Sequence, residues 1–314
     1  CSISIVDTGQ NTLTGGRLRR LKKYLKPETV IKLNAMSLRA RLIVEGYIIG
    51  HHRSPYHGFS VEFAEHKAYG VGDEVRHIDW KLYGKTDRLY VKRYQEETNL
   101  RANIILDTSK SMTYNSDKVS KLEYANLLTA ALSYLMIHQQ DAAGLIKFSN
   151  KINSYIRPKS RPSHLNIIMN NLNDFETGND TKIELVLHEM ADRINKRGLV
   201  ILISDLFDDP NQIMNGLKHF RHKNQEVIVF HLLDRKEITF DFNTRTKFLD
   251  METGLEIDTE PWKIRDSYIK KIKELQNFYK VRCGKNLIDY VPIFTDQSLD
   301  LCLTEYVNKR KKLS

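Results

Sequence analysis

Cysteine is scarce in this sequence. Only Cys1, Cys283 and Cys302 occur among 314 residues, and no two of them form a Cys-x-x-Cys pair. Three scattered cysteines exclude a disulfide framework and an all-cysteine zinc site, and they suit a reducing compartment, so we expect a cytoplasmic protein. Glycine and proline are also few, at 15 and 7 residues. That scarcity argues against collagen-like and low-complexity chains.

Long apolar runs are absent as well. The longest, such as the run at 199–203, fall far short of the roughly 18 to 20 residues that cross a bilayer. The N-terminus has no basic segment followed by an apolar one, so we expect neither a membrane span nor a Sec signal. Cys1 stands where an initiator methionine belongs, and we therefore expect a fragment; a lipid-modified mature cysteine is the less favoured interpretation.

The composition is that of a folded chain. Hydrophobic residues make up 41% of the sequence and charged residues 28%, and this balance excludes wholesale disorder. A length of 314 residues is enough for one large domain or two modest ones, each able to bury a core.

The net charge of +10 is concentrated at the two ends. Residues 1–100 hold 17 basic and 11 acidic residues, a net +6, and residues 101–314 hold 32 and 28, a net +4. The last +4 comes from Lys309, Arg310, Lys311 and Lys312, which leaves 101–308 neutral. We interpret the excess as solvated termini and rank nucleic-acid binding below the other functions considered.

Apolar runs and amphipathic stretches alternate from residue 101 onward. The patterns predict strands at 103–106, 142–148, 199–203, 227–233 and 287–294, and helices at 122–139, 165–172, 183–196, 210–223 and 264–279. Strand–helix alternation of this kind predicts a doubly wound α/β fold with a mostly parallel sheet. Ligand sites in such folds lie at the carboxyl ends of the strands.

The preceding segment has a different pattern. Residues 28–100 predict one helix around 37–45, a region rich in Gly, His, Arg and Tyr, and a short strand near 89–94. We therefore divide the chain into an N-terminal extension at 1–27, a small α+β module at 28–100, the main domain at 101–308 and a basic tail at 309–314.

Oxygen-bearing side chains follow two of the predicted core strands. Asp107, Ser109 and Ser111 come directly after the first strand, and Asp205 follows a later one. Both groups therefore fall at the ligand edge of the sheet. Carboxylates and hydroxyls form a hard oxygen environment, which suits Mg²⁺ or Mn²⁺ and does not suit zinc. The alternative is structural: the two serines cap the following helix and Asp107 holds the loop.

These residues resemble the metal-ion-dependent adhesion site of von Willebrand factor A-like domains. The matching positions are Asp107, Ser109, Ser111, Thr181 and Asp205. The resemblance implies that the three hydroxyls bind the ion directly, while the two carboxylates neutralise it, partly through water. One coordination position then stays open for a Glu or Asp of a partner protein.

A longer pattern narrows the resemblance further. The stretch HKAYGVGDEVRHIDW at 66–80, followed by LYVKRY at 89–94 and by Glu96-Glu97, resembles the signature of the bacterial family called domain of unknown function 58. The match covers roughly residues 28–308. Members are often encoded beside MoxR-type AAA+ ATPases, so the resemblance implies a non-enzymatic adaptor between such an ATPase and a client protein.

Enzymatic alternatives have less support in the residues. A haloacid-dehalogenase-like phosphatase needs a carboxylate two residues after its first Asp, where this chain has Ser109. Phosphate-loop, Rossmann, His-Glu-x-x-His and Gly-x-Ser-x-Gly motifs are all missing from the sequence. Because Mg²⁺ beside two carboxylates also activates water, a metal-assisted phosphoester hydrolase stays as the alternative function.

Overall fold

The computed structural model describes residues 36–51, 65–70, 78–93, 100–174, 183–249 and 256–313. These residues fall into two compact units. The larger unit joins 36–51 to 100–313, and the smaller unit lies within 52–99.

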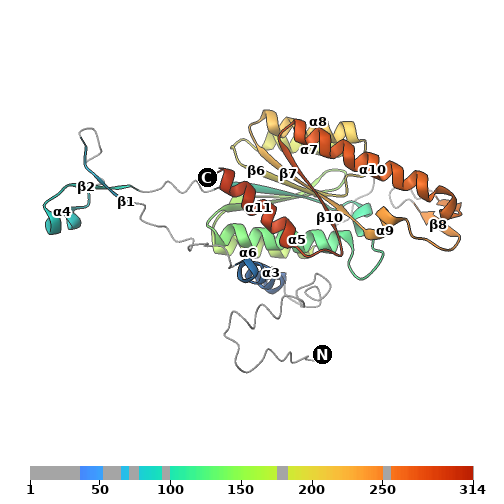
Figure 1. The fold of residues 1–314 in the computed structure, drawn as a ribbon, viewed down its shortest axis with the longest axis horizontal. Helices are drawn as coiled ribbons and strands as arrows, with labels where there is room; N and C mark the ends of the chain where they lie inside the picture. The colour runs from blue at the N-terminus through green and yellow to red at the C-terminus, as the bar shows by residue number, and fades with distance from the viewer. Residues whose placement is uncertain are drawn as a thin grey trace, which may run out of the picture. The chain divides into compact units, whose positions relative to one another are not determined.

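A six-stranded sheet forms the centre of the larger unit (Figure 1). Its strands are β3 (Arg101–Asp107), β4 (Ala142–Phe148), β5 (Ile152–Lys159), β6 (Leu199–Ser204), β7 (Glu226–Leu233) and β10 (Ile288–Phe294). Their order is β10-β7-β6-β3-β4-β5. All neighbours pair in parallel except β5, which runs antiparallel to β4 at one edge. Numbered within this unit, the order is the doubly wound 3-2-1-4-5-6 arrangement, which confirms the predicted fold class.

Continuous apolar runs become strands covered on both faces. Every residue of β4 and of β6 is buried, as expected for central parallel strands. The edge strand β5 was not predicted from the sequence. Its residues are half-buried or exposed and it includes Pro158, a composition typical of an edge.

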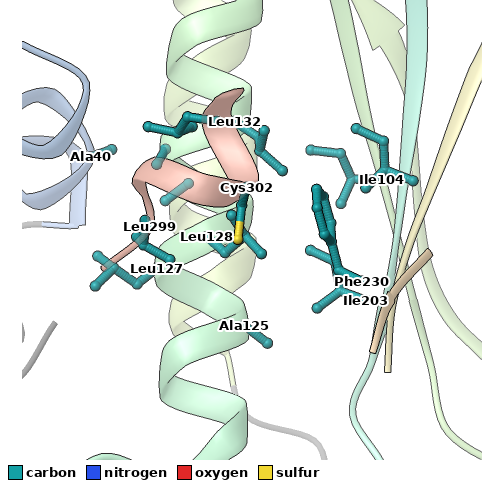
Figure 2. Packing of buried hydrophobic residues seen from close by; sticks show 14 of the residues in the cluster. Ala40, Ile104, Ala125, Leu127, Leu128, Leu132, Ile203, Phe230, Leu299 and Cys302 are labelled. Atoms are coloured by element: carbon teal, nitrogen blue, oxygen red, sulfur yellow. The ribbon is translucent and has the colours of Figure 1, made fainter. Parts of the chain in front are cut away.

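Helices cover both faces of the sheet (Figure 1). On one face lie α3 (Met36–His51), α5 (Lys121–His138), α6 (Pro162–Asn173) and α11 (Asp300–Leu313). On the other lie α7 (Ile183–Arg193), α8 (Pro210–His222) and α10 (Pro261–Lys285). Helix α5 is buried almost all round, and Figure 2 shows Leu128 and Leu132 of α5 between Ala40 of α3 and Ile104 of the sheet.

Helix α3 corrects the boundary drawn at residue 100. The sequence division placed this helix in the small module, whereas the structure groups it with the larger unit. The physical reason is its apolar face: Ala40, Ile43, Val44 and Tyr47 are buried in the same cluster as α5. The smaller unit holds β1 (Glu65–Ala68) paired antiparallel with β2 (Tyr90–Arg93), and helix α4 (Trp80–Thr86), which Asp79 caps.

The basic tail expected at 309–314 is also corrected. Residues 309–313 form the last turns of α11. Lys309 pairs with Glu226 and Asp289, and Arg310 pairs with the buried Asp141. Lys309 and Arg310 therefore fasten α11 to the amino ends of the strands.

Candidate metal centre

Asp107 is the last residue of β3, and its carboxylate is fully buried. The backbone N–H of Ser109 donates to Oδ1 at 2.9 Å, and the hydroxyl of Ser204 donates to Oδ2 at 2.6 Å. The register explains the second bond, because Leu106 of β3 lies opposite Ile203 of β6. Asp107 thus joins the carboxyl ends of two neighbouring strands.

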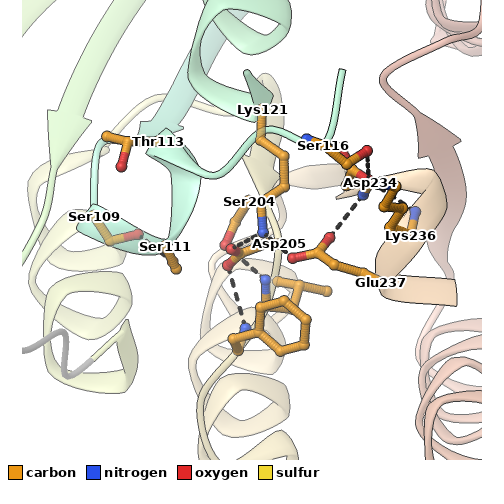
Figure 3. Close-up of polar contacts among 12 residues, drawn as sticks. Ser109, Ser111, Thr113, Ser116, Lys121, Ser204, Asp205, Asp234, Lys236 and Glu237 are labelled. Atoms are coloured by element: carbon orange, nitrogen blue, oxygen red, sulfur yellow. Dashed lines mark hydrogen bonds and ion pairs between the residues drawn. The ribbon is translucent and has the colours of Figure 1, made fainter. Parts of the chain in front are cut away.

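Ser109 and Ser111 point their hydroxyls toward each other, with the two Oγ atoms 3.0 Å apart (Figure 3). They lie at the start of a single 3₁₀ turn at Lys110–Thr113, and the Ser109 side chain makes no capping hydrogen bond. Helix α5 is capped by Ser120 instead. The capping interpretation of the two serines is therefore wrong. The structural role suggested for Asp107 is real, since Asp107 accepts the Ser109 N–H.

Asp205 follows β6 at the same edge and is 1% exposed. One of its oxygens, Oδ2, accepts a hydrogen bond from the ammonium of Lys121 at 2.7 Å. The other, Oδ1, has only a long contact of 3.4 Å with the N–H of Phe207. Leu206, which lies between Asp205 and Phe207 in the chain, is buried and adopts a left-handed conformation with φ of 54°. That conformation costs about 1 kcal/mol. This turn follows directly on the two residues that reach the site, Ser204 and Asp205.

The two carboxylates repel each other in a place that water does not reach. Burial, followed by the charge of Asp205, raises the pKa of Asp107 to about 7. The hydrogen bonds from Ser204 and Ser109 oppose this rise in the pKa. A nearby cation favours the ionised form of a carboxyl group, so a positive ion between Asp107 and Asp205 would offset both the burial and the repulsion.

The donor set fits a hard divalent cation. Two neighbouring ligands of an octahedral Mg²⁺, each at about 2.1 Å, are about 3.0 Å apart, and the Ser109 and Ser111 hydroxyls have that separation. These two hydroxyls would hold the ion, and Asp107 and Asp205 would balance its charge. Within the described ranges no three His, Cys, Asp or Glu side chains gather as metal ligands, so a site here depends on hydroxyls. Thr181, the fifth predicted ligand, lies outside the described residues.

His231 supports the Asp205 loop from the neighbouring strand β7. Its Nε2–H donates to the Asp205 carbonyl at 2.8 Å, and its Nδ1 accepts from the Tyr290 hydroxyl at 2.7 Å. Acceptance at Nδ1 requires the neutral ring, and full burial lowers the pKa of His231 to about 4. These contacts give both ring nitrogens a partner, so His231 is a buried structural residue.

This histidine makes the fold sensitive to acid. Its folded pKa of about 4 lies below the ordinary value of 6.5, so the unfolded chain takes up the proton first. Its contribution to stability is complete above pH 6.5 and is lost as the pH falls toward 4, by up to about 1.4 kcal/mol per pH unit. Denaturant unfolding from pH 7 to pH 4.5 should show a shallower loss in His231→Gln than in the wild type. Equal slopes in the two proteins would contradict this assignment.

Sequence reasoning assigned no role at the centre to three side chains: Ser204, Lys121 and Glu237. Ser204 directly precedes Asp205 on a buried strand, so its side chain had to lie at the same edge. Lys121 begins a helix that is buried on almost every side, and its own burial follows from that packing. Glu237 belongs to the short helix α9 (Arg235–Thr239), and no periodic pattern in the sequence indicated that helix.

The comparisons with known proteins place the chain among uncharacterised relatives. The family model described as "Protein of unknown function DUF58" matches residues 65–277. Uncharacterized proteins of Mycobacterium bovis and Mycobacterium tuberculosis are 20% identical over 249 residues, which is 78% of this chain and 78% of each relative.

Two bacterial proteins are among the solved structures that align with this chain. An aerotolerance-related membrane protein of Bacteroides fragilis aligns with a TM-score of 0.45 at 17% identity, over 67% of this chain and 99% of its own. The conserved hypothetical protein BatB of Bacteroides thetaiotaomicron aligns with a TM-score of 0.44 at 18% identity, over 68% and 99%. In the part of this chain that the structure describes, every helix is too short or too polar to span a membrane.

Proposed function

This chain belongs to the DUF58 family of proteins of unknown function, and from that premise we propose that it is a non-enzymatic, cytoplasmic protein-binding module whose binding depends on a divalent cation. Ser109 and Ser111 would hold Mg²⁺ or Mn²⁺, with Thr181 as a third hydroxyl ligand and with Asp107 and Asp205 as counter-charges. The bound ion would supply a hard positive centre that accepts one more oxygen ligand. A Glu or Asp of a partner protein is the ligand that fits.

The observation that carries this proposal is the pair of hydroxyls 3.0 Å apart beside Asp107, whose pKa is raised by burial and by the charge of Asp205. Two carboxylates and these neutral hydroxyls leave at least one coordination position of a divalent ion unfilled. We propose that the partner is a MoxR-type AAA+ ATPase or the client that it acts on.

Helix α10 adds a second feature that favours an acidic partner. Its sequence contains eight basic and two acidic residues, a net charge of +6, although 101–308 as a whole is neutral. Lys270, Lys271 and Lys273 are exposed. Charge of one sign on an exposed helix steers partners of the opposite charge.

Reversing that charge tests the contribution of α10. The triple variant Lys270→Glu, Lys271→Glu, Lys273→Glu should slow association with the partner about tenfold at low ionic strength, since long-range attraction sets the association rate. The difference should shrink at high salt, because screening removes it. Surface plasmon resonance at two salt concentrations measures both effects. An unchanged rate at low salt would remove α10 from the interface.

The metal dependence is tested by capture of the partner. The full chain should retain a MoxR-type ATPase of the same organism in the presence of Mg²⁺ and release it in EDTA, and Asp107→Ala should retain none. Loss of a bound ion also lowers stability. The melting temperature of each sample therefore needs to be measured and must lie above the temperature of the capture. Capture that is indifferent to EDTA and to Asp107→Ala, by protein that stays folded, would refute metal-dependent binding.

Hydrolysis of a phosphoester is the alternative. A hydrolase at this edge would need a general acid or base, but Asp205 is held by Lys121 and both oxygens of Asp107 accept hydrogen bonds. We therefore rank hydrolysis below binding. Turnover of a generic phosphodiester by the purified chain, abolished by Asp205→Ala, would reverse that ranking.

A further inference from the structure

A buried lysine lies beside the candidate metal centre. The side chain of Lys121 is 1% exposed, and its ammonium contacts two carboxylates, Asp205 Oδ2 and Glu237 Oε1, each at 2.7 Å (Figure 3). The ring of Phe207 closes a third side, with its centroid 4.9 Å from Nζ. The buried ammonium is thus held by charge and by an aromatic face.

Glu237 links this ammonium to a second part of the edge. It lies in α9, and its other oxygen, Oε2, accepts the backbone N–H of Asp234 at 2.7 Å. The carboxylate of Asp234 in turn accepts hydrogen bonds from the N–H and hydroxyl of Ser116. The loop before α5, the start of α9 and the loop after β6 therefore all meet at Lys121.

The charges in this cluster do not balance. Lys121 faces two carboxylates, and Asp107 is a third carboxylate close enough to interact electrostatically with Asp205. A buried ammonium neutralises a carboxylate as a metal ion does, but it supplies a single charge. The ammonium and a divalent ion between Asp107 and Asp205 would therefore compete for Asp205, and each would repel the other.

We propose that Lys121 is a built-in cation that competes with the divalent ion for Asp205, and that Glu237 sets the strength of this competition by drawing the ammonium toward α9. This inference rests on the proposed metal centre. Lys121 holds Asp205 in place through the ion pair. A bound ion would attract the charge of Asp205, and Glu237 would then be the main partner of the ammonium.

The two partners of the ion pair should then have opposite effects on metal affinity. Lys121→Met removes the competitor, so Mn²⁺ should bind about tenfold more tightly than to the wild type. A change in affinity of this size is typical for residues that contact a metal ligand. Glu237→Gln leaves the ammonium wholly to Asp205, and Mn²⁺ should bind several-fold more weakly. A merely structural role for the pair predicts weaker binding in both variants.

The experiment is calorimetric titration of the full chain with Mn²⁺, with melting temperatures recorded for every variant. Lys121→Met leaves Glu237 buried without its partner and risks misfolding, so the double variant Lys121→Met, Glu237→Gln, which removes both charges, is measured beside it. The double variant should bind Mn²⁺ more tightly than Glu237→Gln does. Lys309→Met is the matched control, because Lys309 also joins two carboxylates, Glu226 and Asp289, at the opposite ends of the strands; its affinity should equal that of the wild type.

Failure of this inference and failure of the metal centre give different results. If the wild type binds Mn²⁺, and Lys121→Met and the double variant bind it equally or more weakly, competition by Lys121 is wrong and the metal centre stands. If no protein in the series binds Mn²⁺, both are wrong. Binding by Lys121→Met alone would support competition and refute metal-dependent function of the wild type.

Discussion

Replacing Asp107 by asparagine should lower the affinity for Mn²⁺ by about 100-fold or more. Residues that only orient metal ligands change affinity by about 10- to 100-fold, and Asp107 supplies one of the two carboxylate charges at this centre. Asparagine keeps the shape of the side chain and accepts the Ser109 N–H that Asp107 accepts now. The variant should therefore fold, and capture of the partner should be lost together with the metal.

Asp289→Asn is the control for this prediction. Asp289 lies near the amino end of β10 and pairs with Lys309, so its loss removes one negative charge from the same domain without touching the centre. Its Mn²⁺ affinity should stay within about twofold of the wild type, since a half-buried charge at the opposite end of the strands is screened from the ion. If Asp107→Asn binds Mn²⁺ as well as Asp289→Asn does, the ion does not lie at Asp107.

Alanine at Gly198 should destabilise the larger unit by about 3 kcal/mol or more, the upper end for overpacking. Gly198 immediately precedes β6, and a β-carbon there would lie 2.2 Å from the carbonyl oxygen of Arg101 in β3. The obstacle is backbone, so no side chain can rotate away and the two strands must separate. Because β3 carries Asp107 and β6 leads to Asp205, the folded fraction of this variant should also bind Mn²⁺ more weakly.

Gly284→Ala is the matched substitution, with the opposite sign. Gly284 lies within α10, and a β-carbon there meets nothing within 4 Å. Alanine should stabilise the helix by about 0.5–1 kcal/mol through its higher helix propensity. Denaturant titration of both variants measures the difference. Equal destabilisation in the two, or none in Gly198→Ala, would contradict the close approach of β3 and β6.

The sequence predicted the centre of the fold better than its margins. Strands β6 and β7 are continuous Val, Ile and Leu runs, a pattern that follows directly from burial on both faces. The edge strand β5 and helix α11 have mixed composition because each buries only part of its surface, and both were missed. Helix α3 was found, but its assignment to the small module was wrong, because periodicity shows that a face is buried and not which element covers it.

The candidate site was likewise predicted only in part. The position of Asp107 and Asp205 directly after core strands was enough to bring them to one edge of the sheet. The ammonium that pairs with Asp205 belongs to a helix 84 residues earlier in the chain. Its partner Glu237 lies on a five-residue helix. Contacts of this kind depend on tertiary packing, and local spacing carries no signal for them.

The most direct test of the metal centre is a crystal of the full chain soaked in Mn²⁺ and measured for anomalous scattering. The account predicts one strong peak within about 2.5 Å of the hydroxyl oxygens of both Ser109 and Ser111, with Asp107 and Asp205 facing it. A crystal soaked at a concentration that saturates binding in solution, with no peak at these hydroxyls, would contradict it.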